Sequence, residues 1–218
     1  MRYLHDSGYT TLSIDEVAQF LRGRPFHGKI VAIAFDDGWA SELSAVPVLK
    51  QYGFKATFFI IGNRPDGGNN RYMGWDKIKD LAANPLFSIQ SHTMTHPWEP
   101  GNTLIDWLKG THPIKGREHA VWELTESKHI LEKKLGKPVS YLAWPCGIYN
   151  DELVKMAENA GYKALFTVDD GMNHPHEDPF RISRAPVDGR CDFETFKKDI
   201  LAGHSKDCSP VNQGKPQN

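Results

Sequence analysis

Residues 29–38 read KIVAIAFDDG, an apolar run that ends in two aspartates and a glycine. Its isoleucine, valine and phenylalanine residues favour a β-strand. Because polar residues do not alternate with the apolar ones, we expect both faces of this strand to be buried, as in parallel sheets covered by helices. The stretch therefore predicts a central strand of an α/β protein, with Asp36 and Asp37 at its carboxyl end.

The same pattern extends along most of the chain. Segments with helical periodicity separate the strand-like runs, and most of these segments close on Gly or Asn, the usual residues after a helix. Strands that alternate with helices predict a mainly parallel sheet. The strand-like runs cover residues 10–14, 29–35, 55–61, 86–89, 139–144, 163–168 and 180–187.

Composition limits the class of protein. The chain has 218 residues, of which 39% are hydrophobic and 24% charged, and this fits one globular domain. The net charge of -1 gives no electrostatic reason to expect nucleic acid as a partner. No apolar stretch approaches the roughly 20 residues of a membrane-spanning helix.

The two ends of the chain differ in character. We expect a globular domain over residues 1–203 and a disordered tail over residues 204–218, which are polar and rich in Pro and Gly. The opening residues MRYLHDSG resemble the end of a helix rather than a secretory signal. We therefore expect the natural protein to begin further upstream.

Polar residues follow the strand-like runs where each run ends. In a parallel α/β barrel the carboxyl ends of all strands lie on one face, which carries the functional site. One acidic turn after a strand is ordinary turn chemistry, but several polar segments on the same face indicate a site. They are Asp36–Gly38, the pair His92 and His96, Pro145–Gly147, Asp169–Gly171 and, inside the last run, Arg184.

His92 and His96 are four positions apart, a spacing that metal sites use but that also arises by chance. Asp37 adds an oxygen ligand from another strand end. Imidazole nitrogens and a carboxylate oxygen suit zinc or a similar divalent ion. Three protein ligands leave positions open for water and substrate, which is typical of a catalytic ion. The sequence therefore predicts a catalytic metal site at Asp37, His92 and His96.

Two of these segments resemble a known family. Phe35–Gly38 (FDDG) and His92–His96 (HTMTH) resemble the first two motifs of the NodB-type polysaccharide deacetylases, carbohydrate esterase family 4. The resemblance implies a distorted (β/α) barrel of about seven strands, metal ligation by Asp37 and the two histidines, and Asp36 as the catalytic base. Two adjacent aspartates fit this division, because a carboxylate that does not bind the metal can take a proton from water.

The third motif departs from the usual form of the family. Residues 143–147 read AWPCG, without the arginine and the aromatic residue that most members carry. This departure resembles the subgroup that deacetylates poly-β-1,6-N-acetylglucosamine. By this resemblance, the backbone N–H of Cys146 would help to hold the oxyanion, and Arg184 would replace the missing arginine beside Asp36. A surface ion pair remains the alternative for Arg184.

The remaining candidates are substrate-binding residues and the general acid. Trp39 and Trp98 can stack on sugar rings or pack against the barrel, and we place Pro145 with them as a substrate contact. His204, in the segment LAGH, would protonate the leaving amine, as a histidine after the last strand does in the wider family. In the β-1,6 subgroup the equivalent histidine lies upstream of the segment with which this chain begins, so the identity of the acid stays open.

Together these features predict a metal-dependent hydrolase that removes N-acetyl groups from N-acetylglucosamine residues of a polysaccharide. The resemblance favours poly-β-1,6-N-acetylglucosamine as substrate and zinc as the ion, with nickel, cobalt or iron as alternatives. Chitin oligomers, peptidoglycan or xylan stay open as substrates, as does a non-catalytic glycan-binding module on the same fold. A glycan substrate implies a periplasmic or cell-surface location, although the chain contains no signal peptide.

Overall fold

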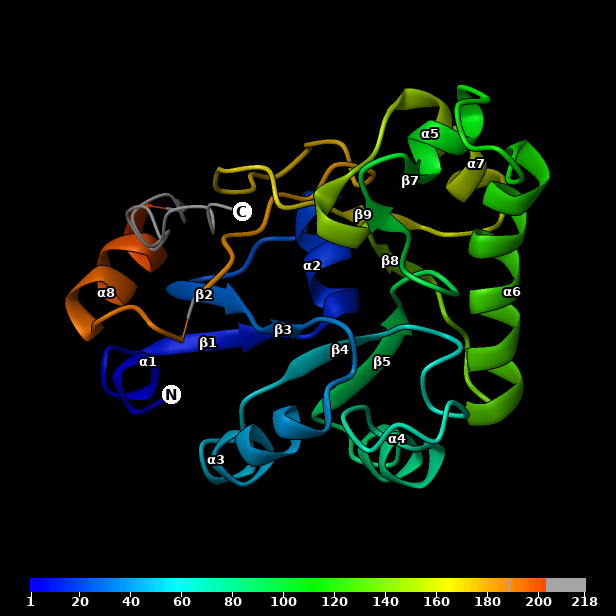
Figure 1. The fold of residues 1–218 in the computed structure, drawn as a ribbon. Coiled ribbons are helices and arrows are strands. Elements are labelled where there is room, and N and C mark those ends of the chain that lie inside the picture. Colours follow the sequence, from blue (N-terminus) through cyan, green and yellow to red (C-terminus); the bar gives the residue numbers. More distant parts are fainter. Residues whose placement is uncertain (188, 203–218) are drawn as a thin grey trace, which may run out of the picture.

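The computed structural model describes residues 1–187 and 189–202, and a curled parallel sheet lies at its centre (Figure 1). Two further parallel strands, β1 (Tyr9–Leu12) and β2 (Lys29–Ala32), continue the sheet, since only Ile33 separates β2 from β3 (Ala34–Phe35). Parallel strands curled in this way and covered by helices form a distorted (β/α) barrel, as predicted. The five central strands lie in the order β3 (Ala34–Phe35), β4 (Ala56–Ile60), β5 (Phe87–Ser91), β8 (Tyr141–Ala143) and β9 (Ala164–Phe166).

The last predicted strand, residues 180–187, is much shorter in the structure. Only Ile182 joins the sheet, through a parallel bridge to Phe166. The next residue, Ser183, already donates its backbone N–H to the side-chain oxygen of Asn173 at 2.9 Å. The chain therefore leaves the sheet after one bridge, because its backbone finds partners in a neighbouring loop.

Helices alternate with the strands, as the sequence predicts. Ser13 caps α2 (Ile14–Leu21), because its side chain accepts the Glu16 N–H and the Glu16 carboxylate accepts the Ser13 N–H. Two helices, α5 (Leu104–Leu108) and α8 (Phe193–Ala202), were not predicted, nor was a short hairpin of β6 (Trp98–Glu99) and β7 (Asn102–Thr103). The α-helices are α1 (Arg2–Asp6), α2 (Ile14–Leu21), α3 (Val46–Gln51), α4 (Trp75–Ala82), α5 (Leu104–Leu108), α6 (Arg117–Leu135), α7 (Asp151–Asn159) and α8 (Phe193–Ala202).

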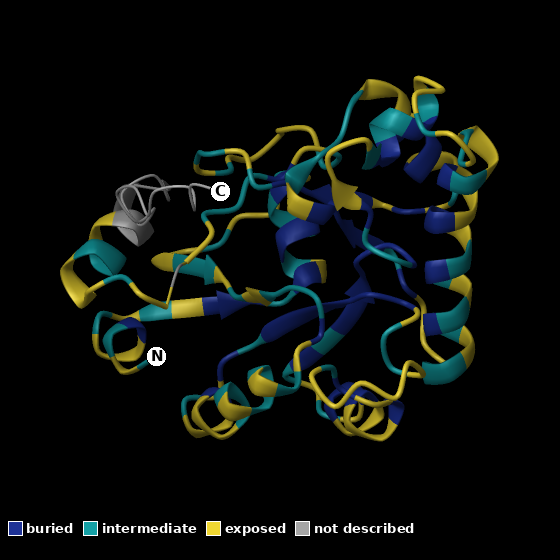
Figure 2. Ribbon diagram, viewed as in Figure 1, coloured by how far each residue is buried: buried dark blue, intermediate teal, exposed yellow. Residues whose placement is uncertain are grey.

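Both faces of the sheet are buried along its central strands, as Figure 2 shows. The predicted burial of residues 29–35 is wrong, because Ala32 and Ala34 of β2 and β3 are exposed. Phe58 and Phe59 are neighbours on β4 and both fully buried, yet they belong to different apolar clusters. Phe58 shares a cluster with Ile78 of α4 and Leu124 of α6. Phe59 shares the other cluster with Val17 of α2. Helix α2 therefore covers the opposite face of the sheet from α4 and α6, and this double packing holds the strand ends in fixed positions.

The remaining features of the chain bear less on the site. Among the described residues, no helix is long and apolar enough to cross a membrane. Helices α1 and α8 lie at the same end of the molecule, where the rings of Tyr3 and Phe193 are 5.4 Å apart (Figure 1). The predicted disordered tail, residues 204–218, lies outside the described residues.

Candidate active site

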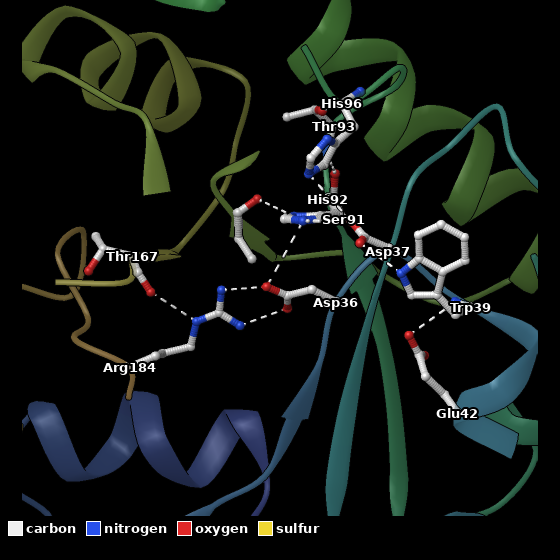
Figure 3. Close-up of polar contacts among 11 residues, drawn as sticks. Asp36, Asp37, Trp39, Glu42, Ser91, His92, Thr93, His96, Thr167 and Arg184 are labelled. Atoms are coloured by element: carbon white, nitrogen blue, oxygen red, sulfur yellow. Dashed lines mark hydrogen bonds and ion pairs between the residues drawn. The ribbon is translucent and has the colours of Figure 1, made fainter. Parts of the chain in front are cut away.

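The two aspartates after β3 face different partners because the chain turns tightly there. Asp37 and Gly38 have φ angles of 76° and 77°, in the left-handed region. A Cβ atom on Gly38 would lie 2.9 Å from Ile60 Cδ1, so the turn packs closely on β4 and favours glycine. Figure 3 shows Asp36 directed toward Arg184 and Asp37 directed toward the histidines.

The histidines lie on the loop after β5. His92 is buried, and its Nδ1–H donates to Ala143 O at 2.8 Å, which fixes the tautomer with an Nε2 lone pair facing the site. Thr93 and His96 have φ angles of 62° and 60°, and these left-handed residues wrap the loop into a turn. As a result, the Nε2 atoms of His92 and His96 each lie 3.4 Å from Asp37 Oδ1.

Asp37, His92 and His96 fit a divalent metal ion. One ligand atom of each residue lies within 4.8 Å of the other two. Asp37 Oδ1 is buried without a hydrogen-bond donor, an arrangement that is costly unless a cation satisfies the oxygen. Burial, and next to it His92, lowers the pKa of His96 to about 4, so its imidazole is neutral at pH 7 and can ligate. Two nitrogens and one carboxylate oxygen match the donors of catalytic zinc sites.

Asp36 is held by a bidentate ion pair. Arg184 Nη1 and Nη2 donate to Asp36 Oδ1 and Oδ2 at 2.7 and 2.8 Å, and Arg184 Nε donates to Thr167 O at 2.9 Å. Only 16% of the Arg184 side chain is exposed, so this is not a surface ion pair. Burial acts to raise the pKa of Asp36, but His92 and Arg184 outweigh it and hold that pKa below its usual range. Asp36 is therefore ionised at neutral pH.

The third motif forms a single 3-10 turn, Pro145–Gly147, after β8. Cys146 adopts a left-handed conformation with φ of 51°. Burial, and after it the charges of Asp37 and Asp36, raises the pKa of the Cys146 thiol, so this thiol stays protonated at neutral pH. Pro145 is buried at the start of this turn. Its contact with substrate stays a prediction.

The predicted tryptophans lie at the rim of the site. Trp39 Nε1–H donates to Asp37 Oδ2 at 2.9 Å, and Glu42 Oε1 accepts the Trp39 N–H at 3.0 Å. Burial raises the pKa of Glu42 to about 8. The sequence did not reveal Glu42 as an acidic neighbour of Trp39. Trp98, on the β6–β7 hairpin, is 52% exposed. His204, the candidate acid, lies outside the described residues.

Glu123 holds the histidine loop in place, a role that the sequence pattern did not show. It lies on α6 and is 1% exposed. Its Oε2 accepts the N–H groups of Met94 and Thr95, each at 2.8 Å, and its Oε1 accepts the Thr95 hydroxyl. All three bonds go to the segment between His92 and His96. A glutamate within a polar helix ordinarily indicates a solvated face, so only the tertiary structure reveals this contact.

We expect Glu123→Gln to weaken metal binding about 10- to 100-fold, the usual effect of losing a residue that orients metal ligands. Glutamine has the shape of glutamate, but an NH₂ donor replaces one of its two acceptor oxygens. This donor would then face the N–H or hydroxyl donors of the histidine loop. Calorimetric titration of zinc into metal-free protein measures the dissociation constant, and thermal unfolding of the metal-free protein measures stability separately.

Glu132→Gln is the matched control for this prediction. Glu132 lies on the same helix, and its Oε1 accepts the Val139 N–H at 3.0 Å, away from the histidine loop. We expect this variant to lose stability without losing affinity for zinc. An unchanged affinity for zinc in Glu123→Gln would contradict the role assigned to Glu123.

Comparison with known families confirms the resemblance seen in the two motifs. The family model for polysaccharide deacetylases matches residues 23–165 of this chain. This range contains the aspartates after β3, both histidines and the third motif.

Individual relatives agree with the family match. The chain is 31% identical over 189 residues to YxkH of Bacillus subtilis, a provisionally named polysaccharide deacetylase, covering 86% of this chain and 62% of YxkH. It is 28% identical over 200 residues to the poly-β-1,6-N-acetyl-D-glucosamine N-deacetylase of Staphylococcus epidermidis, covering 89% of this chain and 66% of that relative. The chain thus spans less than two thirds of the length of either relative. Among solved structures, the deacetylase PplD of Streptococcus pyogenes in complex with acetate superposes with a TM-score of 0.78 at 25% identity, covering 91% of this chain and 83% of PplD.

Proposed function

Since the chain belongs to the polysaccharide deacetylase family, we propose that it removes N-acetyl groups from N-acetylglucosamine residues of a polysaccharide. The proposal rests on the different surroundings of two adjacent carboxylates, Asp36 and Asp37. Asp37 faces both histidines, whereas Asp36 is paired with Arg184 while its Oδ2 lies 4.0 Å from His92 Nε2. A module that only binds glycan would need no second carboxylate beside the ligands, and no arginine to keep it ionised.

Asp37, His92 and His96 are the proposed ligands of the metal ion. Zinc suits their two nitrogens and one oxygen, and nickel, cobalt or iron are alternatives with the same donors. When bound, such an ion lowers the pKa of water and polarises a carbonyl oxygen.

The other residues of the site have separate proposed roles. Asp36 takes the proton of the attacking water, and Arg184 orients Asp36 and keeps it ionised. The backbone N–H of Cys146 donates to the acetamide oxygen as negative charge develops there. His204 is the proposed general acid that protonates the leaving amine.

Poly-β-1,6-N-acetylglucosamine is the proposed polysaccharide. The name of the Staphylococcus epidermidis relative and the arginine-free third motif, AWPCG, both support this substrate. Trp39 and Trp98, exposed at the rim, are the proposed contacts for sugar rings. A polymer of this kind lies outside the cytoplasm, so we place the protein in the periplasm or at the cell surface.

The choice of polysaccharide is tested by rates of acetate release from β-1,6-linked and β-1,4-linked N-acetylglucosamine oligomers of equal length and from acetylated xylan. We expect the β-1,6 oligomer to give the largest kcat/KM. A larger kcat/KM for the β-1,4 oligomer or for xylan would contradict this substrate while leaving the deacetylase chemistry intact.

Removing Arg184 tests its role toward Asp36. Because Arg184 helps to hold the pKa of Asp36 below its usual range, Arg184→Met raises this pKa. Asp36 would then be protonated at a higher pH, so we expect the acidic limb of the pH profile of kcat/KM to move to higher pH. Arg181→Met is the matched control, since Arg181 pairs with Asp151 at 2.6 Å on the surface. An acidic limb at the same pH in Arg184→Met and the unmodified protein would contradict this role.

A further inference from the structure

A cavity of about 180 Å³ lies beside the metal site, and His96 belongs to both. It is smaller than the roughly 300–1,000 Å³ of sites for drug-sized ligands, so it suits a single sugar ring rather than an oligosaccharide. Because the two sites share His96, a chain bound across the metal site can reach into this cavity. Its walls are formed by Arg64, Thr95, His96, Pro97, Trp98, Glu99 and Asn102.

The loop that carries Arg64 is docked on the histidine loop. The N–H groups of Gly62 and Asn63 donate to Thr93 O and Met94 O, each at 3.0 Å. A Cβ atom on Gly62 would lie 2.7 Å from Met94 Sδ, so the two loops approach closely. The position of the cavity is therefore fixed relative to the metal ligands.

Arg64 brings hydrogen-bond donors to this cavity without using them elsewhere. Its Nε is buried without a partner, and in the described part of the chain no carboxylate oxygen lies within 4.0 Å of its guanidinium. The guanidinium lies 5.2 Å from the centre of the Tyr72 ring, and Tyr72 stacks on Trp39 with centroids 4.4 Å apart. The stacked side chains of Trp39, Tyr72 and Arg64 therefore connect Asp37, which accepts a hydrogen bond from Trp39, to the cavity. A buried donor without an acceptor is costly, so a ligand that brings an oxygen acceptor to Arg64 Nε would remove this cost.

The remaining walls complete a pattern suited to a sugar. Trp98 offers an exposed indole face, and the Glu99 carboxylate can accept from hydroxyl groups. Asn102 Oδ1 accepts the Trp107 Nε1–H at 3.1 Å, which leaves the amide group of Asn102 to donate. Donors, acceptors and one flat apolar face lie around a single small space.

We propose that this cavity binds the pyranose residue next to the one being deacetylated. Arg64 donates to a hydroxyl or acetamido oxygen of that residue, and Trp98 packs against its ring. The inference rests on the proposed function. It adds a site that makes binding depend on the length of the sugar chain. A monosaccharide occupies the metal site alone, whereas an oligomer occupies both sites.

The test compares β-1,6-linked N-acetylglucosamine oligomers of increasing length with the monosaccharide, using zinc-loaded protein. We expect Arg64→Ala to raise KM for a pentamer about tenfold, the effect of losing a hydrogen bond from a charged donor. The values of kcat for the pentamer and kcat/KM for the monosaccharide stay near those of the unmodified protein. Trp98→Ala is also expected to raise KM for the pentamer. Trp122→Ala is the matched control, since Trp122 is also exposed but lies on α6, away from the cavity walls.

An equal loss of kcat/KM for the monosaccharide and the pentamer in Arg64→Ala would overturn the proposal, as would an unchanged KM for the pentamer. A binding assay separates this outcome from failure of the proposed function. Pentamers with β-1,6 and β-1,4 linkages are titrated into zinc-loaded Asp36→Asn protein with and without Arg64→Ala. Weaker binding of either pentamer after Arg64→Ala supports the cavity as a sugar site even without acetate release, and equal or absent binding overturns it.

Discussion

Asp36→Asn is expected to reduce acetate release about 10²- to 10⁴-fold, the usual contribution of a positioned general base. Asparagine keeps the shape of the side chain but cannot take the proton of water. Because Asp37 and the histidines are unchanged, the affinity for zinc should stay close to that of the unmodified protein. Rates of acetate release and calorimetric zinc titrations on the same preparations separate these two effects.

The control for this variant is a second Asp–Arg pair. Asp151 pairs with Arg181 at 2.6 Å, but on the surface, with 83% of the Asp151 side chain exposed. Asp151→Asn should release acetate at close to the normal rate. Full activity in Asp36→Asn would contradict the assignment of the base, and a large loss of zinc affinity in that variant would show that Asp36 is itself a ligand.

His96→Ala is expected to weaken zinc binding by more than about 100-fold, beyond the effect of residues that only orient ligands. Each ligand of a three-residue site supplies a direct bond to the ion, and two ligands hold it poorly. In the unmodified protein, zinc at 100 times its dissociation constant should stabilise the fold by about 2.7 kcal/mol. We expect His96→Ala to lose this zinc-dependent rise in the unfolding temperature, together with acetate release.

His129→Ala is the control, because His129 is exposed on α6. It should keep both the zinc-dependent stabilisation and the activity. His92→Ala gives a second test, although His92 also donates to Ala143 O and its loss will destabilise the metal-free protein as well. Normal zinc affinity in His96→Ala would contradict the ligand set.

Several features encoded in short stretches of sequence were predicted correctly. The apolar run before Asp36 indicates a parallel strand, and it forms β2 and β3, with β3 paired to β4. The prediction that both faces of this run are buried is wrong, because Ala32 and Ala34 are exposed. The polar residues after β3 and β5 meet at one edge because parallel strands carry their carboxyl ends to the same face. Local patterns therefore sufficed for the parallel sheet and for the grouping of Asp37, His92 and His96, whereas the barrel was implied by the family resemblance.

Features that depend on tertiary contacts were not predictable in the same way. Glu123 on α6 meets the histidine loop only after the chain has folded, and nothing in its neighbours in the sequence indicates this. The run at residues 180–187 has the composition of a strand, but the Ser183 N–H donates to the Asn173 side chain instead of to a neighbouring strand. Pro145 follows a strand like the site residues, yet the tight turn around Cys146 buries it. Arg184 was connected with Asp36 through the family resemblance, not through any pattern around it.

We propose that this chain is a metal-dependent deacetylase of N-acetylglucosamine polymers. The most direct test is acetate release from β-1,6-linked N-acetylglucosamine oligomers by zinc-loaded and chelator-treated protein. We expect release by the zinc-loaded protein, loss of release after chelation, and recovery when zinc is added back. Undiminished release by metal-free protein, or no release from any N-acetylglucosamine oligomer by protein that has bound zinc, would contradict this proposal.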